Sequence, residues 1–190
     1  CFDSGSARFI WWARFVSPRG SGEIGSQRLV TSSVVIMGVA GSGKTTIGRV
    51  LSEHLGLSFH DGDDFHSPGN IKKMTSGEAL TDEDRDGWLS TLSHLIKDKE
   101  DVVLACSALK RSYRDRLRES DSSLLFVFLD VSVETAKDRL RARGDHFMPA
   151  SLIISQFSAL ERPRDAIRID AEQPVAAVVR DLKGRLERSR

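Results

Sequence analysis

The stretch Val34-Val35-Ile36-Met37-Gly38-Val39-Ala40-Gly41-Ser42-Gly43-Lys44-Thr45 decides how this chain folds. Its first four residues are apolar, as expected for a strand that is buried on both faces of a sheet. The next eight match the pattern G-x-x-x-x-G-K-[ST], in which backbone N–H groups surround phosphate oxygens because glycine has no Cβ to obstruct them. A helix that begins near Lys44 would aim the positive end of its dipole at the same phosphates. Strand, glycine loop and helix in this order predict a phosphate-binding loop.

The loop also predicts a nucleotide and a metal ion. Lys44 is expected to reach the β- and γ-phosphates of ATP, and the Thr45 hydroxyl is expected to ligate Mg²⁺. A simple tight turn is the alternative, but all eight motif positions and both flanks agree with a phosphate loop. No N-K-x-D or T-K-x-D tetrapeptide occurs, which argues against a GTPase. The predicted ATP-binding residues are Gly38, Val39, Ala40, Gly41, Ser42, Gly43, Lys44, Thr45 and Thr46.

Outward from the loop, short apolar strands alternate with amphipathic helices, which is typical of a parallel sheet wrapped by helices. Residues 33–190 are therefore predicted to form one α/β domain. Thr81-Asp82-Glu83-Asp84 has capping-box spacing and predicts a helix that runs to about Asp98. Further strands are predicted at 102–106, 124–129 and 166–169. The residues expected to face inward are Ile47, Val50, Leu51 and Leu55 on the first helix, which Gly56 ends, and Val175, Val178, Val179, Leu182 and Leu186 on a last helix opened by Pro174.

Composition excludes several classes of partner. The 190 residues contain 28 Lys and Arg against 27 Asp and Glu, so there is no overall basic field to attract nucleic acid or a membrane surface. The longest apolar runs, such as 124–129, fall far below the roughly 20 residues of a membrane-spanning helix. Two cysteines, Cys1 and Cys106, lack metal-site spacing and are interpreted as free thiols, with a disulfide between them as the alternative.

The first 32 residues differ from the rest of the chain. They are rich in Ser, Gly and Arg, and Asp3 and Glu23 are their only acids. Such a composition is typical of an organelle transit segment, and a disordered extension is the alternative. A cytoplasmic location is expected unless this segment directs the protein to an organelle.

A pair of acids, Asp61 and Asp63, follows the second predicted strand, at the edge where open α/β sheets bind ligands. Transfer of a phosphoryl group to an alcohol needs a carboxylate near the hydroxyl and Mg²⁺ on the triphosphate, and two such acids could divide these tasks. A solvated acidic loop is the alternative. Asp130 also ends an apolar run, as a Walker B acid would, but it precedes a predicted helix cap at Ser132, and we favour a structural role for it.

Several motifs together resemble the gluconokinase family, over about residue 33 to the C-terminus. More distantly, the chain is similar to shikimate kinases and nucleoside monophosphate kinases. The resemblance implies a P-loop NTPase fold with a five-stranded parallel sheet, helices on both faces and a mobile lid at about 139–149. It also implies a homodimer and transfer of the γ-phosphate of ATP to the 6-hydroxyl of gluconate. The motifs are Gly38 to Lys44; Asp61-Gly62-Asp63 with His66, Asn70, Lys73 and Met74; Leu80 to Trp88; Cys106 to Lys110 with Tyr113-Arg114; and His146-Phe147 with Gln156-Phe157.

The resemblance assigns roles to individual residues. Asp63 would be the base that faces the 6-hydroxyl, and Asp61 would help Thr45 to hold Mg²⁺, although the two acids could exchange roles. Arg85 would grip the gluconate carboxylate with two parallel hydrogen bonds, the alternative being a surface arginine paired with Asp82 or Asp86. The other predicted substrate-binding residues are His66, Lys73, Ser107, Lys110 and His146; a loop histidine and a solvated lysine are the alternatives for His66 and Lys73.

The predicted lid contributes arginines. Arg139 and Arg143 would neutralise charge on the γ-phosphate in the transition state, whereas Arg141 is expected on the surface. Two other functions stay open: a kinase of the same fold that acts on shikimate or a nucleoside monophosphate, and a binding module that hydrolyses ATP without an acceptor.

Overall fold

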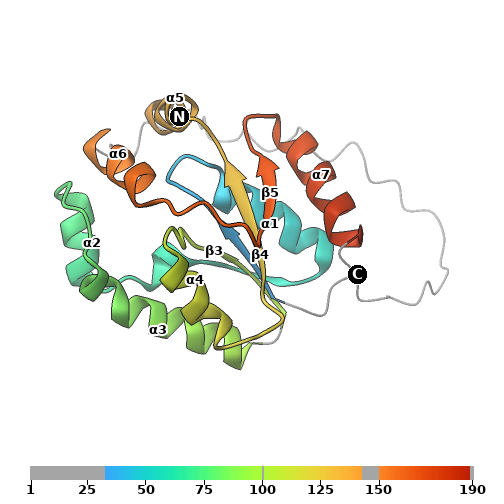
Figure 1. Cartoon of the computed structure of the whole chain (residues 1–190), viewed down its shortest axis with the longest axis horizontal. Coiled ribbons are helices and arrows are strands. Elements are labelled where there is room, and N and C mark those ends of the chain that lie inside the picture. The colour runs from blue at the N-terminus through green and yellow to red at the C-terminus, as the bar shows by residue number, and fades with distance from the viewer. Residues whose placement is uncertain (1–32, 100, 143–149, 189–190) are drawn as a thin grey trace, which may run out of the picture.

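The computed structural model describes residues 33–99, 101–142 and 150–188. Strands and helices alternate along the chain, as the sequence predicted, and the α/β fold class is confirmed (Figure 1). The strands are β1 (Val34–Met37), β2 (Ser58–Asp61), β3 (Val102–Ala105), β4 (Leu125–Asp130) and β5 (Ile167–Asp170). The helices are α1 (Lys44–Leu55), the 3₁₀ turn η1 (Gly62–Phe65), α2 (Pro68–Thr75), α3 (Asp82–Asp98), α4 (Arg111–Arg118), α5 (Val133–Ala142), α6 (Ala150–Ala159) and α7 (Val175–Arg188).

The five strands form one parallel sheet in the order β2-β3-β1-β4-β5. In a parallel sheet all carboxyl ends lie at the same edge, where open α/β folds place their ligands. The residues that follow β1, β2 and β3 therefore meet there, and they include the phosphate loop and the acid pair.

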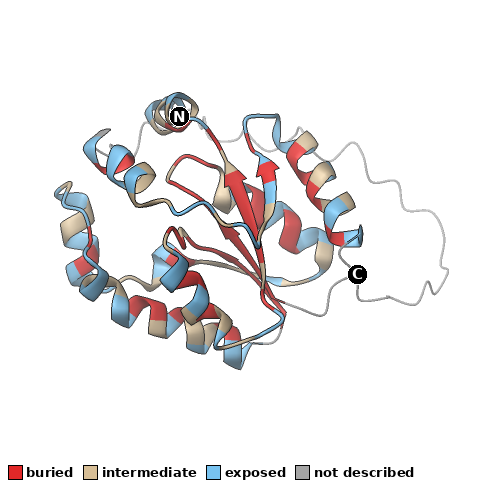
Figure 2. Cartoon of the chain, viewed as in Figure 1, coloured by how far each residue is buried: buried red, intermediate tan, exposed pale blue. Residues whose placement is uncertain are grey.

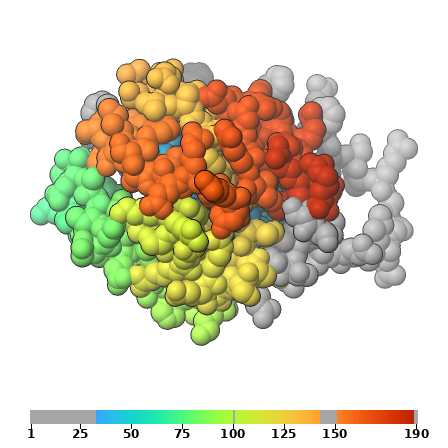
Figure 3. All heavy atoms as spheres, viewed as in Figure 1, coloured from blue at the N-terminus to red at the C-terminus, as the bar shows by residue number. Residues whose placement is uncertain are grey.

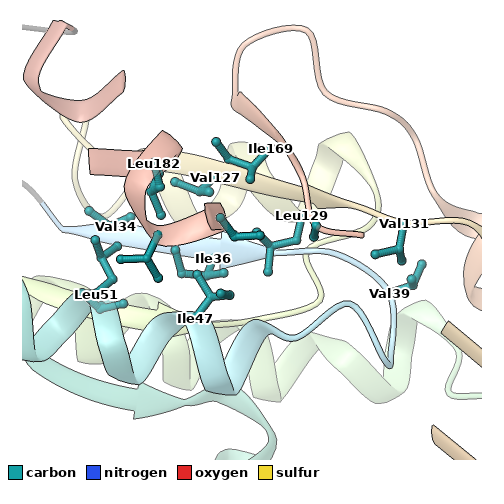
Figure 4. Packing of buried hydrophobic residues seen from close by; sticks show 14 of the residues in the cluster. Val34, Ile36, Val39, Ile47, Leu51, Val127, Leu129, Val131, Ile169 and Leu182 are labelled. Carbon is teal, nitrogen blue, oxygen red and sulfur yellow. The ribbon is translucent and has the colours of Figure 1, made fainter. Parts of the chain in front are cut away.

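Two apolar cores lie on opposite faces of the sheet, because successive side chains of a strand point to opposite sides. Val34 and Ile36 pack with residues of α1 and α7 on one face (Figure 4). Val35 and Met37 pack on the other face with residues of α3 and α4. All four side chains are fully buried, and Figure 2 shows the central strands as continuous buried segments. The prediction of a central strand covered on both sides is confirmed.

Local signals at helix ends behave as predicted. Gly56 ends α1 in the left-handed conformation, with φ of 69°. At the start of α3, the Thr81 hydroxyl accepts from the Asp84 N–H while the Asp84 carboxylate accepts from the Thr81 N–H, which completes the capping box. The three later strands lie within one residue of their predicted bounds.

Two predicted inward positions are wrong. Val50 is 38% exposed and Val175 is 44% exposed. On α1, Gly48 is buried instead of Val50. The Gly48 backbone lies against the Phe59 ring, and a Cβ on Gly48 would be only 2.6 Å from it. Val175 is the first residue of α7, and the inward face begins one turn later at Val178.

Cys106 is a buried free thiol, and burial raises its pKa to about 12. Over 33–99, 101–142 and 150–188, no helix is both long enough and apolar enough to span a bilayer. Residues 1–32, with Cys1 and the predicted targeting segment, lie outside the described residues, as do residues 143–149 of the predicted lid.

Candidate active site

The phosphate loop connects β1 to α1 with the backbone geometry that its glycines permit. Gly41 and Gly43 have φ of 80° and 96°, in the left-handed region. A Cβ on Gly41 would lie 2.5 Å from the carbonyl oxygen of Ala136 in α5, whereas a Cβ on Gly43 would meet nothing within 4 Å. The N–H of Gly38 donates to the carbonyl of Ser107, at 3.3 Å. Neighbouring segments thus fix the loop at both ends.

Lys44 and Thr45 lie in the first turn of α1. The Lys44 ammonium donates to the carbonyl of Val39 at 3.0 Å, which brings the side chain back over the loop. The Thr45 hydroxyl donates to Oδ2 of Asp61 at 2.7 Å. The structure therefore brings together the two residues predicted to hold Mg²⁺, and a hydroxyl beside a carboxylate suits that hard cation. Thr46, the last predicted nucleotide-binding residue, is exposed in the same turn.

The acid pair is held by a buried polar contact. Asp61 caps η1, its Oδ1 accepting from the N–H of Asp63 at 3.2 Å. Between the two acids, the Gly62 carbonyl accepts from the indole N–H of Trp88 at 2.7 Å. A Cβ on Gly62 would lie 2.8 Å from the Ala105 carbonyl, so the backbone passes directly against β3. Asp63 itself is exposed at the edge of the sheet.

His66 packs flat against Trp88, with ring centroids 4.5 Å apart and an interplanar angle of 12°. Its Nδ1 lies 3.4 Å from the side-chain amide of Asn70. Burial lowers the pKa of His66, an effect that the charge of Asp63 opposes and that of Arg85 reinforces. The ring is therefore held neutral beside the acid pair.

A cavity of about 300 Å³ lies beside the phosphate loop, since two of its lining residues, Ser107 and Gln156, accept hydrogen bonds from the loop backbone. We call it the acceptor cavity. Its walls come from the start of α3, the turn between β3 and α4, and α6. Three predicted substrate-binding residues, Arg85, Ser107 and Lys110, line it. Its other lining residues are Leu80, Thr81, Asp82, Leu109, Tyr113, Ser155, Gln156 and Ala159.

The cations of the acceptor cavity have different partners. Arg85 donates to the carbonyls of Leu80 and Thr81. The structure therefore does not have the ion pair with Asp82 or Asp86 that was the alternative for Arg85. Lys110 instead holds both oxygens of Asp82, each at 2.7 Å. The Tyr113 hydroxyl donates to the same carboxylate. The hydrogen bonds from Lys110 and Tyr113 lower the pKa of Asp82.

Lys73 stands apart from the residues that line the acceptor cavity. Its ammonium contacts both oxygens of Asp84, at 2.8 and 2.9 Å, and Glu78 at 3.8 Å. The Lys73 side chain thus links α2 to the capping box of α3, and the hydrogen bond to Asp84 raises its pKa.

The predicted lid arginines are only partly described. Arg139 in α5 donates to the carbonyls of Ser42, at 3.4 Å, and Ala171, at 2.7 Å. It therefore lies against the phosphate loop. Arg143 and His146 lie outside the described residues.

Asp130 has the structural role that we favoured. Its side chain is only 12% exposed and accepts from Arg162 at 2.7 Å and from Arg168 at 2.5 Å. The Ser132 hydroxyl accepts from the N–H of Thr135, at 3.2 Å, and so caps α5 as predicted. Two arginines thus neutralise the carboxylate that imitates a Walker B acid.

Known proteins with the same architecture bear on this site. A solved gluconokinase from Sinorhizobium meliloti 1021 is 45% identical, with a TM-score of 0.79 over 84% of this chain and 93% of that one. A gluconokinase of Gluconobacter oxydans (strain 621H) is 45% identical over 156 residues, which cover 78% of this chain and 88% of the relative. The chain belongs to the gluconokinase family. A sequence model of the shikimate kinase family also matches residues 40–168.

For a member of the gluconokinase family, the P-loop fold and the use of ATP follow, and both predictions are confirmed. The thermosensitive gluconokinase of Escherichia coli (strain K12) is a further relative, 43% identical over 159 residues, which cover 80% of this chain and 85% of the relative. From the sequence, Tyr113 and Gln156 were recognised only as members of motifs, and Asp82 only as part of the capping-box segment and as a partner for Arg85. The motif that contains Cys106 to Lys110 and Tyr113 is the sequence feature from which one wall of the cavity could have been predicted.

Proposed function

We propose that this protein transfers the γ-phosphate of ATP to the 6-hydroxyl of D-gluconate. The observation that carries the proposal is the position of Ser107. Its carbonyl accepts from Gly38 in the phosphate loop, and the same residue lines the acceptor cavity. Nucleotide phosphates and an acceptor in the cavity would thus be immediate neighbours, as direct phosphoryl transfer requires.

The charge of the acceptor cavity supports a small acid as the substrate. Arg85 and Lys110 contribute two positive charges, and Asp82 contributes one negative charge. The balance of one positive charge matches the single carboxylate of gluconate. Because the Arg85 guanidinium is held by carbonyls, it keeps its full charge for a carboxylate. Asp82, Tyr113 and Ser107 offer polar atoms that suit a row of hydroxyls, and a volume of about 300 Å³ suits a small ligand.

In this mechanism Asp63 orients the acceptor hydroxyl and takes its proton, while Lys44 and the loop amides hold the phosphates. Mg²⁺, when bound by Thr45 and Asp61, would neutralise charge on the triphosphate. Arg139 and Arg143 are proposed to stabilise charge on the γ-phosphate as it spreads in the transition state. His66, Lys73 and His146 stay predicted neighbours of the substrate.

A coupled assay of ADP release, with gluconate present and absent, tests the activity. Turnover that depends on gluconate supports the proposal, and faster turnover with shikimate or a nucleoside monophosphate would overturn it. ATP hydrolysis that is independent of any acceptor would instead indicate a nucleotide-dependent binding module. The homodimer and the cytoplasmic location stay predictions, which light scattering and cell fractionation would test.

The role of Asp63 is tested by Asp63→Asn, with Asp64→Asn as the matched control because Asp64 is an exposed acid in the same 3₁₀ turn. Loss of a general base lowers kcat by about 10²- to 10⁴-fold, and the phosphate loop should still bind ATP. The control should keep near-normal turnover. Equal activity in the two variants would remove Asp63 from the mechanism.

A further inference from the structure

Gln156 in α6 joins the acceptor cavity to the phosphate loop. Its side chain lines the cavity, and its Oε1 accepts from the backbone N–H of Ala40 at 2.7 Å. Because a backbone N–H can only donate, the carboxamide oxygen must face the loop. Nε2, with two hydrogens to donate, then points away from Ala40, and it forms no hydrogen bond within the described part of the chain.

The position of Gln156 is imposed by packing on both sides. Within α6, Leu152 and Ile153 are buried. Just after the helix, the N–H of Glu161 donates to the Leu109 carbonyl at 3.0 Å, and the Glu161 carboxylate accepts from the Arg111 N–H at 2.6 Å. The helix is thus fixed both to the core and to the opposite wall of the cavity. In Figure 3, α6 and the chain that follows it (orange) lie across the middle of the molecule, with only small areas of the blue chain visible beneath.

This location gives the free end of the carboxamide a defined chemical environment. The phosphate loop lies on one side of it and the cavity with Arg85 and Lys110 on the other. An N–H donor between a phosphate site and a sugar-acid site meets oxygen atoms only. Under the proposed function, the alcohol that is phosphorylated lies where the cavity meets the phosphate loop, and the substrate group next to it in the cavity is the neighbouring hydroxyl.

We propose that Gln156 is a specificity-determining residue for the acceptor: its oxygen stays on Ala40, and its Nε2 donates to the hydroxyl beside the one that is phosphorylated. This inference rests on the proposed function, in which that group is the 5-hydroxyl of gluconate. The recognised substrate class is therefore a polyhydroxylated acid with adjacent hydroxyls at the end remote from its carboxylate. An acid that lacks the second hydroxyl leaves the carboxamide donor unpaired.

A cycle of two enzymes and two substrates tests the contact directly. Wild type and Gln156→Leu are each assayed with gluconate and with 5-deoxygluconate. Wild type should lose about threefold to tenfold in kcat/KM when the 5-hydroxyl is missing, the factor for one neutral hydrogen bond. The variant should lose at least a similar factor with gluconate and nothing further with the deoxy substrate. The substitution also removes the acceptor of the Ala40 N–H, and any loss of ATP affinity that follows is common to both substrates and cancels in the cycle.

The control is Ser158→Leu, which places the same side chain at an exposed position of α6 and should leave kcat/KM for both substrates at the wild-type values. If Gln156→Leu does not fold, Gln156→Met replaces it, with the melting temperature as the check. The inference is overturned if the variant still loses as much with the deoxy substrate as wild type does. If the wild type is inactive on gluconate, the proposed function itself is refuted. If the wild type is active but the effects of the substitution and of the missing hydroxyl simply add, only the role of Gln156 is refuted.

Discussion

Replacing Trp88 by phenylalanine should weaken both the fold and the active site, because one indole N–H supports the backbone between the two acids. The Trp88 side chain is 4% exposed, and its N–H donates to the Gly62 carbonyl at 2.7 Å. Phenylalanine keeps an aromatic ring against His66 but has no donor. The variant therefore isolates the hydrogen bond and a small loss of volume.

The expected loss of stability is about 2–4 kcal/mol. Leaving the buried Gly62 carbonyl without a partner costs about 1–3 kcal/mol. Phenyl is smaller than indole by about 40 Å³, and at about 24 cal/mol per Å³ of cavity this adds about 1 kcal/mol. The acids on either side of Gly62 should also lose their fixed placement. A shift of about 1 Å near the reacting atoms lowers kcat by about tenfold to a hundredfold.

Urea denaturation and gluconate turnover measure the two effects. Ile96→Ala is the matched control, because Ile96 lies in the same core cluster and on the same helix, about 12 Å further along its axis. It should cost about 2–5 kcal/mol in stability and leave kcat unchanged while the protein is folded. The reasoning is refuted if Trp88→Phe costs less than about 1 kcal/mol, the lower bound for an unpaired carbonyl. It is also refuted if the two variants have the same kcat.

Two further substitutions test the phosphate loop and the half-buried His66. Gly41→Ala should lower ATP affinity by at least about tenfold, because its Cβ would collide with the Ala136 carbonyl and φ at Gly41 is 80°; wild-type ATP affinity in this variant would count against this geometry. Burial lowers the pKa of His66, so as the pH falls the unfolded chain binds a proton before the folded protein does. The contribution of the neutral ring to the free energy of unfolding is therefore complete above about pH 6.5 and declines below it. His66→Phe should therefore lose less stability than wild type between pH 7.5 and 5.5 in urea denaturation, and an identical slope would contradict the assignment.

Sequence alone predicted the features that depend on a few neighbouring residues. The phosphate loop, the capping box at Thr81 and the left-handed Gly56 each follow from a local pattern, and the structure confirms them. The proximity of Thr45 to Asp61 also follows from the sequence, because both residues come after parallel strands whose ends meet at one edge.

The contacts between distant segments could not be predicted in the same way. Lys73 pairs with Asp84 because α2 lies against the start of α3, where Asn70 also donates to the Asp84 carbonyl, and the sequence pattern does not encode this contact. Gln156 and Ala40 are 116 residues apart, and their contact depends on how α6 lies over the sheet edge. Val50 was misplaced because the buried face of α1 runs through Gly48 and Ser52, and Gly48, which has no side chain, gives no hydrophobic signal in the sequence.

The walls of the acceptor cavity come from three short stretches, around residues 80–85, 107–113 and 155–159, and the phosphates belong to a fourth at 38–45. If the proposed function holds, recognition of the acceptor and binding of the phosphates thus depend on separate parts of the chain. A redesign for a different acceptor could exchange the three stretches and keep the nucleotide half intact. Such a redesign would have to preserve two hydrogen bonds between the parts, from the Gly38 N–H to the Ser107 carbonyl and from the Ala40 N–H to the Gln156 side chain.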